Sequence, residues 1–316
     1  GEVMYQIRQG AAAPIRATFR DMVITRADIS RSKGAIVRGS GLGFLLGHAT
    51  PGVRTLFTDD VHMAWYDDHK AIAFLVQANG NQATEASLAS FAAMKSQYDA
   101  QGIEFMMINP LGEARAEVKQ QADSYSVDIP VLIDDAQLIS EAMGIDKTGE
   151  VFLFDPKSFE VIYRGPAGDS FAAALAEVAA GDEVSRAVVA AQGTLVAYPV
   201  RDRHMQQGVS YSKDVAPILA ENCATCHRDG GIAPFAMDSY AMAQGWSPMI
   251  REVLMTKRMP PAQLDPHVGN FRNDYNLSNE EQQKLLHWIA AGSPKDGDTD
   301  PLAELTWPDS KWAAEL

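Results

Sequence analysis

The stretch Cys223-Ala224-Thr225-Cys226-His227 contains both cysteines of the chain. A Cys-x-x-Cys turn can place two sulfur atoms beneath the vinyl groups of one porphyrin, and the adjacent histidine can supply an axial nitrogen to its iron. The motif therefore predicts one covalently bound haem c, with Cys223 and Cys226 as its attachment points. His227 is the predicted proximal ligand of the haem iron.

Three other chemistries use two cysteines at this spacing: a lone disulfide, a thioredoxin-type redox pair and half of a zinc site. A zinc site needs about four ligands, and the chain has no second cysteine pair. A redox pair of this kind opens a helix that follows a buried strand. The residues before Cys223 have a helical pattern instead, which favours haem attachment.

Helical patterns flank the motif on both sides. Ser212 to Leu219 predicts a helix with a serine cap and an early proline. Ser278 to Glu281 has the sequence of a capping box and opens a helix over Gln282 to Ala291. A third helix begins at Ser247-Pro248 and is expected to run through Arg258. The motif is therefore expected to lie in a small all-helical domain.

The second axial ligand of the iron is predicted to be Met259. It precedes two prolines and lies 32 residues after His227. A thioether on such a rigid segment is a suitable sixth ligand and raises the reduction potential. Core packing is the more common role of a methionine. His267 is the chief alternative ligand and an open sixth position is the third, while His287, beside a tryptophan on the last helix, is the weakest.

Residues 211–296 resemble the monohaem cytochrome c modules of bacterial multidomain proteins. The matching motifs are Lys213 to Leu219, Cys223 to His227, Gly230 to Phe235, Pro248 to Val253, Arg258 to Pro261 and Leu277 to Glu281. The resemblance implies an all-α cytochrome c domain with one haem. It also implies a partner domain in the same chain, since such modules are often fused to redoxin-like or copper monooxygenase-like domains.

Upstream of this module, predicted strands and helices alternate. The expected strands are Ala71 to Gln77, Ile103 to Ile108, Val131 to Ile133, Glu150 to Phe154 and Glu160 to Tyr163, and the expected helices are Glu85 to Tyr98, Ala114 to Ser124, Gln137 to Met143 and Phe171 to Ala179. The order strand, helix, strand, helix, hairpin, helix is typical of a thioredoxin-like domain. Such a domain has a central sheet covered on both faces.

This upstream region resembles the redoxin or peroxiredoxin-like branch of that fold, with Ile129 to Asp134 and Val151 to Asp155 as its most recognisable strands. The family's catalytic cysteine belongs between the first core strand and the next helix, where this chain has the thiol-free segment Asn79 to Thr84. The family's cis-proline belongs before the Val151 strand, where this chain has Thr148-Gly149-Glu150. Thiol oxidoreductase activity is therefore not expected. The domain is interpreted as a scaffold or docking surface.

The predicted fold class is an α/β thioredoxin-like domain followed by an all-α cytochrome c domain. The predicted boundaries are an N-terminal segment over 1–49, the thioredoxin-like domain over 50–195, a linker over 196–210, the cytochrome c domain over 211–296 and a C-terminal tail over 297–316. Gly39 to Gly43 lacks the third glycine of a nucleotide-binding loop. We interpret it as a packing or flexible segment.

Charge and hydropathy limit the partners. The chain has 41 acidic and 27 basic residues, a formal net charge of −14. This balance disfavours nucleic acid and anionic membrane surfaces and favours a basic redox protein as partner. No apolar run approaches the roughly 18 residues of a spanning helix. We expect a periplasmic or exported protein whose signal peptide is absent from this chain, which begins at Gly1.

These features together predict a non-enzymatic electron-transfer protein with one haem c. It could act alone or as a subunit of a larger oxidoreductase, with the thiol-free domain binding the partner. The alternative is a peroxidase-like haem enzyme with an open distal site at the domain junction. An optical spectrum of the ferric protein distinguishes the two, because a methionine-ligated haem has a sulfur charge-transfer band that an open site lacks.

Overall fold

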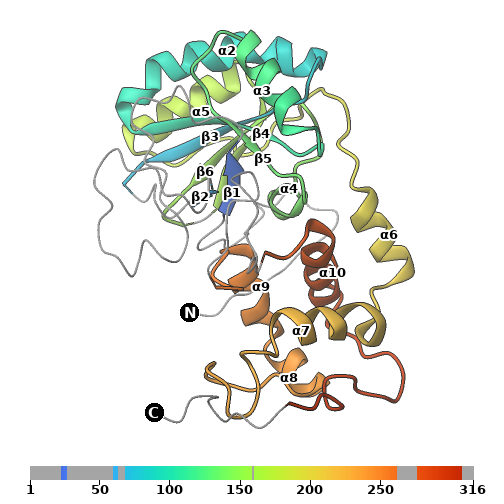
Figure 1. Cartoon of the computed structure of the whole chain (residues 1–316). Coiled ribbons are helices and arrows are strands. Elements are labelled where there is room, and N and C mark those ends of the chain that lie inside the picture. The colour runs from blue at the N-terminus through green and yellow to red at the C-terminus, as the bar shows by residue number, and fades with distance from the viewer. Residues whose placement is uncertain (1–22, 27–59, 63–67, 159, 262–275, 308–316) are drawn as a thin grey trace, which may run out of the picture. The chain divides into compact units, whose positions relative to one another are not determined.

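The computed structural model describes residues 23–26, 60–62, 68–158, 160–261 and 276–307 (Figure 1). The chain divides into two compact units, unit 1 over Gly1–Tyr198 and unit 2 over Pro199–Leu316. Unit 1 contains a sheet with helices, whereas the elements described in unit 2 are all helical.

Unit 1 is built on a seven-stranded mixed sheet with the order β2-β1-β5-β4-β3-β6-β7. The strands are β1 (Val23–Arg26), β2 (Asp60–His62), β3 (Ala71–Val76), β4 (Ile103–Asn109), β5 (Val131–Ile133), β6 (Glu150–Asp155) and β7 (Glu160–Pro166). Strands β3, β4 and β5 are parallel, and β6 and β7 form an antiparallel hairpin beside β3.

The helices of unit 1 are α2 (Gln82–Tyr98), η2 (Asp99–Gln101), α3 (Arg115–Ser124), α4 (Leu138–Met143) and α5 (Asp169–Ala180). The chain therefore runs β3-α2-β4-α3-β5-α4-β6-β7-α5, which confirms the predicted order of strands and helices. With β6 antiparallel to β3 and β7 antiparallel to β6, unit 1 has a thioredoxin-like fold.

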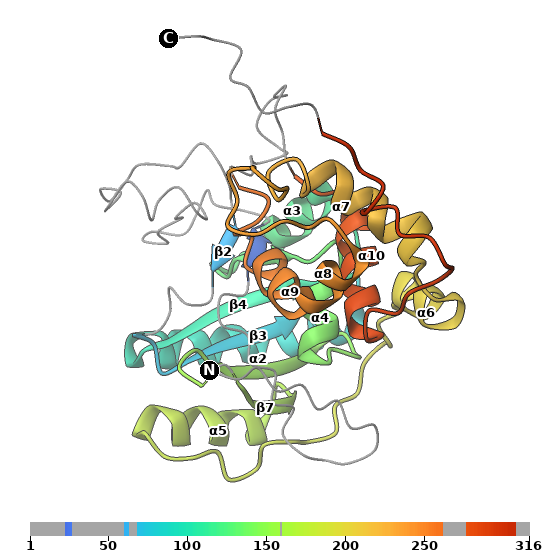
Figure 2. The same cartoon turned by 90° about the horizontal axis from the view of Figure 1, so that it is seen from below.

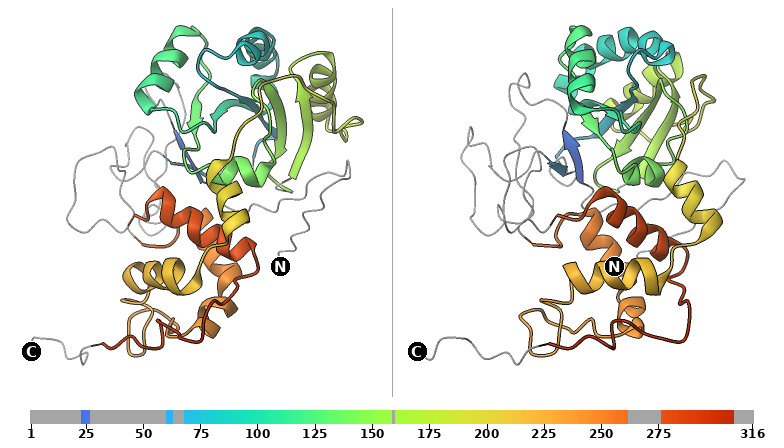
Figure 3. Two further views of the ribbon diagram at one scale, coloured as in Figure 1. Left: turned by 90° about the vertical axis from the view of Figure 1, so that its right-hand side faces the viewer. Right: turned by 45° about the vertical axis from the view of Figure 1, so that its right-hand side comes forward.

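The core of unit 1 lies between the sheet and the helices α2, α3 and α5, which Figures 1 and 3 show along one side of the sheet. All six residues of β3 are fully buried, as the continuous apolar run predicted for a central strand. Phe91 on α2 lies 5.1 Å from the Phe105 ring of β4 and 6.0 Å from the Phe171 ring of α5, measured between ring centroids. These rings connect both helices to the sheet.

The N-terminal region differs from the prediction. Residues 1–49 were expected to lie outside the domain, but β1 belongs to its sheet and pairs antiparallel with both β2 and β5. A four-residue strand offers too few alternations for a period-two pattern to stand out in the sequence. Gly39 to Gly43 lies outside the described residues.

A buried ion pair connects β6 to β7. The Arg164 guanidinium on β7 donates two hydrogen bonds to the carboxylate of Glu150 on β6, at 3.0 and 2.9 Å. It also donates to the Gly144 carbonyl and to Asp146 in the loop before β6. One side chain thus holds the hairpin and this loop together.

Asp134, directly after β5, carries a carboxylate that is almost fully buried. It accepts a hydrogen bond of 2.7 Å from the backbone N–H of Ser140 in α4. Burial raises the pKa of Asp134 from 3.8 to about 6, although the hydrogen bonds from Ser140 and Ile139 act in the opposite direction. The folded protein therefore binds a proton here more tightly than the unfolded chain.

We predict that Asp134→Asn changes how the stability of unit 1 depends on pH. Because the folded-state pKa is raised, the stability that wild type gains from this group is greatest below pH 3.8, falls as pH rises through about 6, and is constant above that. A shift of about two pKa units corresponds to about 3 kcal/mol, the amount that the asparagine variant should gain relative to wild type between pH 3 and pH 7. Urea unfolding of the full chain at both pH values checks this. A wild-type-minus-variant difference that is constant with pH would contradict it.

The described helices of unit 2 are coloured yellow to red in Figure 2. They are α6 (Pro199–Gln207), the π-helical turn η3 (Tyr211–Val215), α7 (Ala216–Asn222), α8 (Tyr240–Gly245), α9 (Ser247–Met255) and α10 (Asn279–Ala290). Trp288 of α10 and Tyr211 of η3 are fully buried, with their ring centroids 6.0 Å apart. No described helix has the length and apolar content needed to cross a membrane.

The caps of these helices agree with the sequence patterns in part. The capping box is confirmed: the Ser278 hydroxyl accepts from the N–H of Glu281, whose carboxylate accepts from the N–H of Ser278. The cap before η3 is Ser210, which accepts from the N–H of Lys213, whereas Ser212 was predicted. The carboxylate of Asp214 accepts a hydrogen bond from the N–H of Ser210 in return. These two bonds place the cap at Ser210, two residues earlier than predicted.

The third helix also ends earlier than predicted. Helix α9 stops at Met255 rather than at Arg258, because Lys257 has a left-handed backbone with φ of 54°. The N–H groups of Arg258 and Met259 then both turn back to the Val253 carbonyl, at 2.9 and 3.2 Å. Met259 therefore lies after the C-terminal end of α9 and is not part of the helix.

Two predicted boundaries are also refined. The segment 196–210, expected as a linker, contains α6 of unit 2. The segment after residue 296, expected as a tail, is attached to the same unit by Asp300. Its carboxylate accepts from the Tyr211 hydroxyl and from the N–H of Tyr240, both at 2.6 Å.

Candidate haem-binding site

The Cys-x-x-Cys-His motif forms a tight turn at the end of α7. The N–H of Cys223 donates to the Leu219 carbonyl at 3.0 Å, and the N–H groups of Cys226 and His227 both donate to the Cys223 carbonyl, at 3.1 and 2.9 Å. Both cysteines are free thiols and partly exposed. The turn therefore brings both thiols and the histidine to one place, at the end of a helix and not at the start of one.

The environment of Cys223 is unlike that of a redox-active thiol. Burial of the thiol, with a smaller contribution from the neighbouring Cys226, raises the pKa of Cys223 to about 12. Reactive cysteines in redox pairs have lowered pKa values, because the thiolate is the nucleophile. The structure thus places Cys223 in a setting that disfavours thiol exchange.

The imidazole of His227 is oriented by a backbone carbonyl. Its Nδ1 lies 3.2 Å from the carbonyl oxygen of Phe235. With Nδ1 donating to that oxygen, the tautomer is fixed and Nε2 keeps its lone pair for a metal ion. The donor set of two thiols and one oriented imidazole fits a covalently attached haem.

The loop after the motif folds back onto it. The N–H of Ala233 donates to the Cys226 carbonyl at 3.2 Å, and the N–H of Met237 donates to the His227 carbonyl at 2.7 Å. At Gly231 a Cβ atom would lie 2.4 Å from the Cys226 carbonyl oxygen, so this approach requires glycine. The loop was predicted only as part of the family motif Gly230 to Phe235, and its contact with Cys226 explains the glycine at position 231.

The other proposed iron ligands are placed less directly. Met259 belongs to the same unit as His227, and its side chain is 39% exposed. Its role as sixth ligand stays a prediction. His267 lies outside the described residues. His287 on α10 contacts His204 on α6, with their Nδ1 atoms 2.8 Å apart.

Within the described ranges, no three His, Cys, Asp or Glu side chains are grouped so as to hold a metal ion. The motif is the only place in the chain with a cysteine.

The thiol-free segment of unit 1 forms a polar cluster with the residues before β6. Asn81 caps α2 by accepting from the N–H groups of Ala83 and Thr84, at 3.0 and 3.2 Å. The Thr148 hydroxyl donates to the same Asn81 oxygen at 2.9 Å, and the N–H of Thr194 donates to Thr148 Oγ1 at 3.2 Å. The two positions named from the family resemblance are thus in contact, and Asn81 acts as a helix cap.

Comparison with known proteins finds solved structures that are similar to part of this chain. No family model and no curated protein matches the chain. A hypothetical protein of Sinorhizobium meliloti is similar at 21% identity and a TM-score of 0.40, over 44% of this chain and 85% of that one. An uncharacterised conserved protein of Geobacillus kaustophilus is similar at 19% identity and a TM-score of 0.40, over 45% of this chain and 85% of that one. The bacterioferritin comigratory protein of Xanthomonas campestris is similar at 12% identity and a TM-score of 0.32, over 39% of this chain and 84% of that one.

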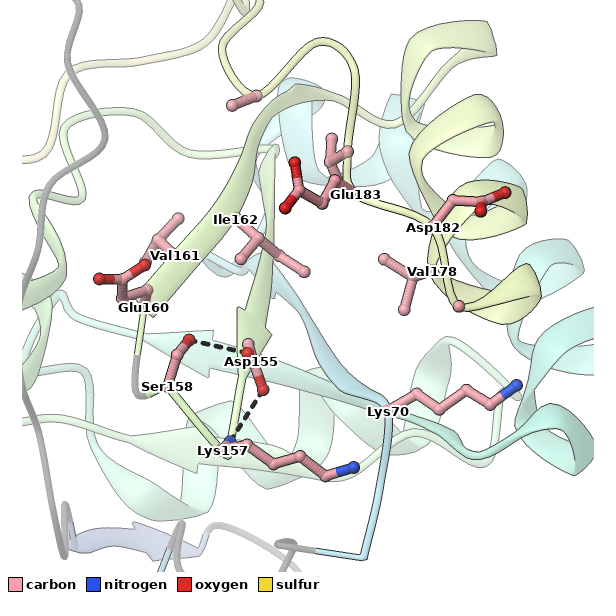
Figure 4. A pocket seen from close by; sticks show the side chains of 13 residues that line it. Lys70, Asp155, Lys157, Ser158, Glu160, Val161, Ile162, Val178, Asp182 and Glu183 are labelled. Atoms are coloured by element: carbon pink, nitrogen blue, oxygen red, sulfur yellow. Dashed lines mark hydrogen bonds between the residues drawn. The ribbon is translucent and has the colours of Figure 1, made fainter.

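Unit 1 also has a surface hollow of about 670 Å³ between the β6–β7 turn and the end of α5 (Figure 4). Its Asp155 carboxylate accepts from the N–H of Lys157 and the hydroxyl of Ser158, at 2.8 and 2.7 Å. Lys70 donates to the Ala179 carbonyl. The lining contains neither cysteine nor histidine, and these polar groups serve the turn and the helix end. The motif in unit 2 remains the candidate site.

Proposed function

We propose that this chain transfers electrons through one covalently bound haem c in unit 2. The observation that carries the proposal is the placement of His227, whose Nδ1 faces the Phe235 carbonyl while two cysteines share its turn. Cys223 and Cys226 would form the thioether bonds, and Nε2 of His227 would bind the iron. When bound, the haem supplies one-electron redox chemistry.

In this proposal unit 2 is a cytochrome c domain. Its described elements are helices, and the buried aromatic core of Tyr211 and Trp288 lies on the helices that flank the motif in sequence. The π-helical turn and α7 lead directly into Cys223. Packing of Tyr211 in the core therefore fixes the orientation of the helix that precedes the motif. A fixed direction is needed if two sulfur atoms are to reach one porphyrin.

Unit 1 would serve as a scaffold or docking surface. It has a thioredoxin-like fold without a cysteine, and its Asn81–Thr148 contact occupies the place where the family resemblance puts the active site. The net charge of −14 supports a basic redox protein as partner. An exported location and membership of a larger oxidoreductase belong to the same proposal.

The identity of the sixth ligand separates electron transfer from the haem-enzyme alternative. We predict that Met259→Ala retains covalent haem, because the cysteines and His227 are unchanged. The reduction potential should fall on the order of 0.1 V, a modest part of the roughly 0.8 V over which axial ligands set haem potentials. The ferric sulfur charge-transfer band should disappear, and carbon monoxide or cyanide should bind.

The matched control is Met249→Ala, since Met249 on α9 is 42% exposed, close to the 39% of Met259. This control should keep the wild-type spectrum and potential. If Met259→Ala also leaves the spectrum unchanged, the ligand is another residue and His267 becomes the next to replace. A wild-type protein that already lacks the charge-transfer band and binds carbon monoxide would favour a haem enzyme with an open site.

A further inference from the structure

We infer that Trp246 is a positioning residue for His227, acting through Phe235. The inference rests on the proposed function, because it assumes that Nε2 of His227 binds the haem iron. It adds a residue that no motif of the sequence analysis included.

Phe235 contacts His227 through both its backbone and its ring. The carbonyl oxygen lies 3.2 Å from Nδ1, and the ring centroids of the two side chains are 4.4 Å apart with 53° between their planes. A shift of the Phe235 backbone would therefore change the hydrogen bond and the ring contact together.

Trp246 in turn holds the ring of Phe235. The two rings are stacked, with centroids 4.2 Å apart and 13° between their planes. The backbone of Trp246 is fixed at the junction of α8 and α9: its N–H donates to the Met242 carbonyl at 3.0 Å, and its carbonyl accepts from the N–H of Ile250 at 2.8 Å. A tryptophan anchored by two helices thus supports the residue that orients the histidine.

The loop that carries Phe235 has little regular structure to replace this support. Residues 228–237 contain no helix or strand, and Ile232 within the loop is 90% exposed. Backbone hydrogen bonds from Gly231, Ala233 and Met237 hold the loop near the motif, and the stack on Trp246 holds the Phe235 ring. Removing the Trp246 ring should loosen the Phe235 carbonyl while leaving the thiols in place.

A looser carbonyl has a measurable consequence. A hydrogen bond from Nδ1 makes an imidazole ligand more basic and so favours the oxidised form of the iron. When that bond weakens, the reduced form gains and the reduction potential rises. The backbone partner of a ligand can therefore set the potential without touching the metal.

The test uses the full chain with haem attached and compares Trp246→Leu with Trp246→Phe, which keeps a ring for stacking. We expect Trp246→Leu to raise the ratio of reduced to oxidised protein about tenfold at a fixed solution potential, which is about 59 mV for one electron. The Nδ1 proton of His227 should exchange faster with solvent in nuclear magnetic resonance spectra of the reduced protein. Trp246→Phe should remain close to wild type in both measurements.

Two further variants keep the test decisive. Phe235→Leu removes the ring but not the carbonyl and should give the same shift, so the inference can be judged even if Trp246→Leu fails to fold. Ser278→Ala weakens the capping box of α10, lowers stability and should leave the potential unchanged.

A wild-type potential and proton exchange rate in both Trp246→Leu and Phe235→Leu would overturn the inference while leaving haem attachment intact. A wild-type chain that carries no haem after expression with cytochrome c maturation would overturn the proposed function and this inference with it. The two failures are distinct, because the mass of the wild-type chain decides the second before any variant is made.

Discussion

Replacing Arg164 with methionine should lower the free energy of unfolding of unit 1 by about 3–5 kcal/mol, because Glu150 is left buried without its charged partner. Only 4% of the Glu150 side chain is exposed. Burial raises the pKa of Glu150 even with Arg164 beside it. Burial alone would lower the pKa of the Arg164 guanidinium. The hydrogen bonds to Glu150 and the negative charge of Glu150 outweigh burial and raise that pKa. Each charge thus depends on the other.

Urea unfolding of the full chain, with amide hydrogen exchange along β6 and β7, measures this loss. The matched control is Lys119→Met on α3, which breaks a pair with Asp123 whose side chains are 43% and 39% exposed. That exposed pair should contribute less than about 1 kcal/mol. Arg164→Met combined with Glu150→Met should recover most of the loss. If Arg164→Met and Lys119→Met lowered the free energy of unfolding equally, the buried pair would contribute no more to stability than the exposed pair, and the prediction would be wrong.

Replacing both Cys223 and Cys226 with serine should abolish covalent haem attachment completely, because the chain has no other cysteine. The reason is chemical: a serine hydroxyl does not form the thioether bond to a vinyl group that holds haem c. The single variant Cys226→Ser should retain one bond and an altered optical spectrum. Denaturing gel electrophoresis with staining for bound haem distinguishes the three chains.

Unit 1 supplies the internal control for this experiment. Its core contains no cysteine, so hydrogen exchange along β3 and β4 should be the same in the double serine variant and in wild type. Haem that remains bound to the denatured double variant would mean attachment by another residue. Loss of protection in unit 1 would mean that the substitutions act on the whole chain.

Much of unit 1 could be predicted from sequence because its core strands are apolar and the loops that connect its strands and helices are polar. Strand β3 is buried on both faces, so its residues form one continuous apolar run that needs no knowledge of neighbours. The capping box at Ser278 is equally local, since all its partners lie within one turn. Features of this kind can be recognised from a few consecutive residues.

Other features depend on contacts between distant residues or on the backbone. The Glu150–Arg164 pair joins two strands, and nothing in either strand alone indicates that the other will supply its partner. The Thr148–Thr194 contact spans 46 residues. The partner of His227 is a carbonyl group of Phe235, which any residue type could provide. Patterns of side chains therefore identified the donors of the candidate site but not what orients them.

Covalent attachment of haem to this chain can be measured from the mass of the denatured wild-type protein. The full chain would be expressed in cells competent in cytochrome c maturation and measured by mass spectrometry under conditions that remove every non-covalent ligand. We expect the mass of the polypeptide plus one haem, located on the peptide that contains Cys223 and Cys226. An unmodified polypeptide mass would contradict it.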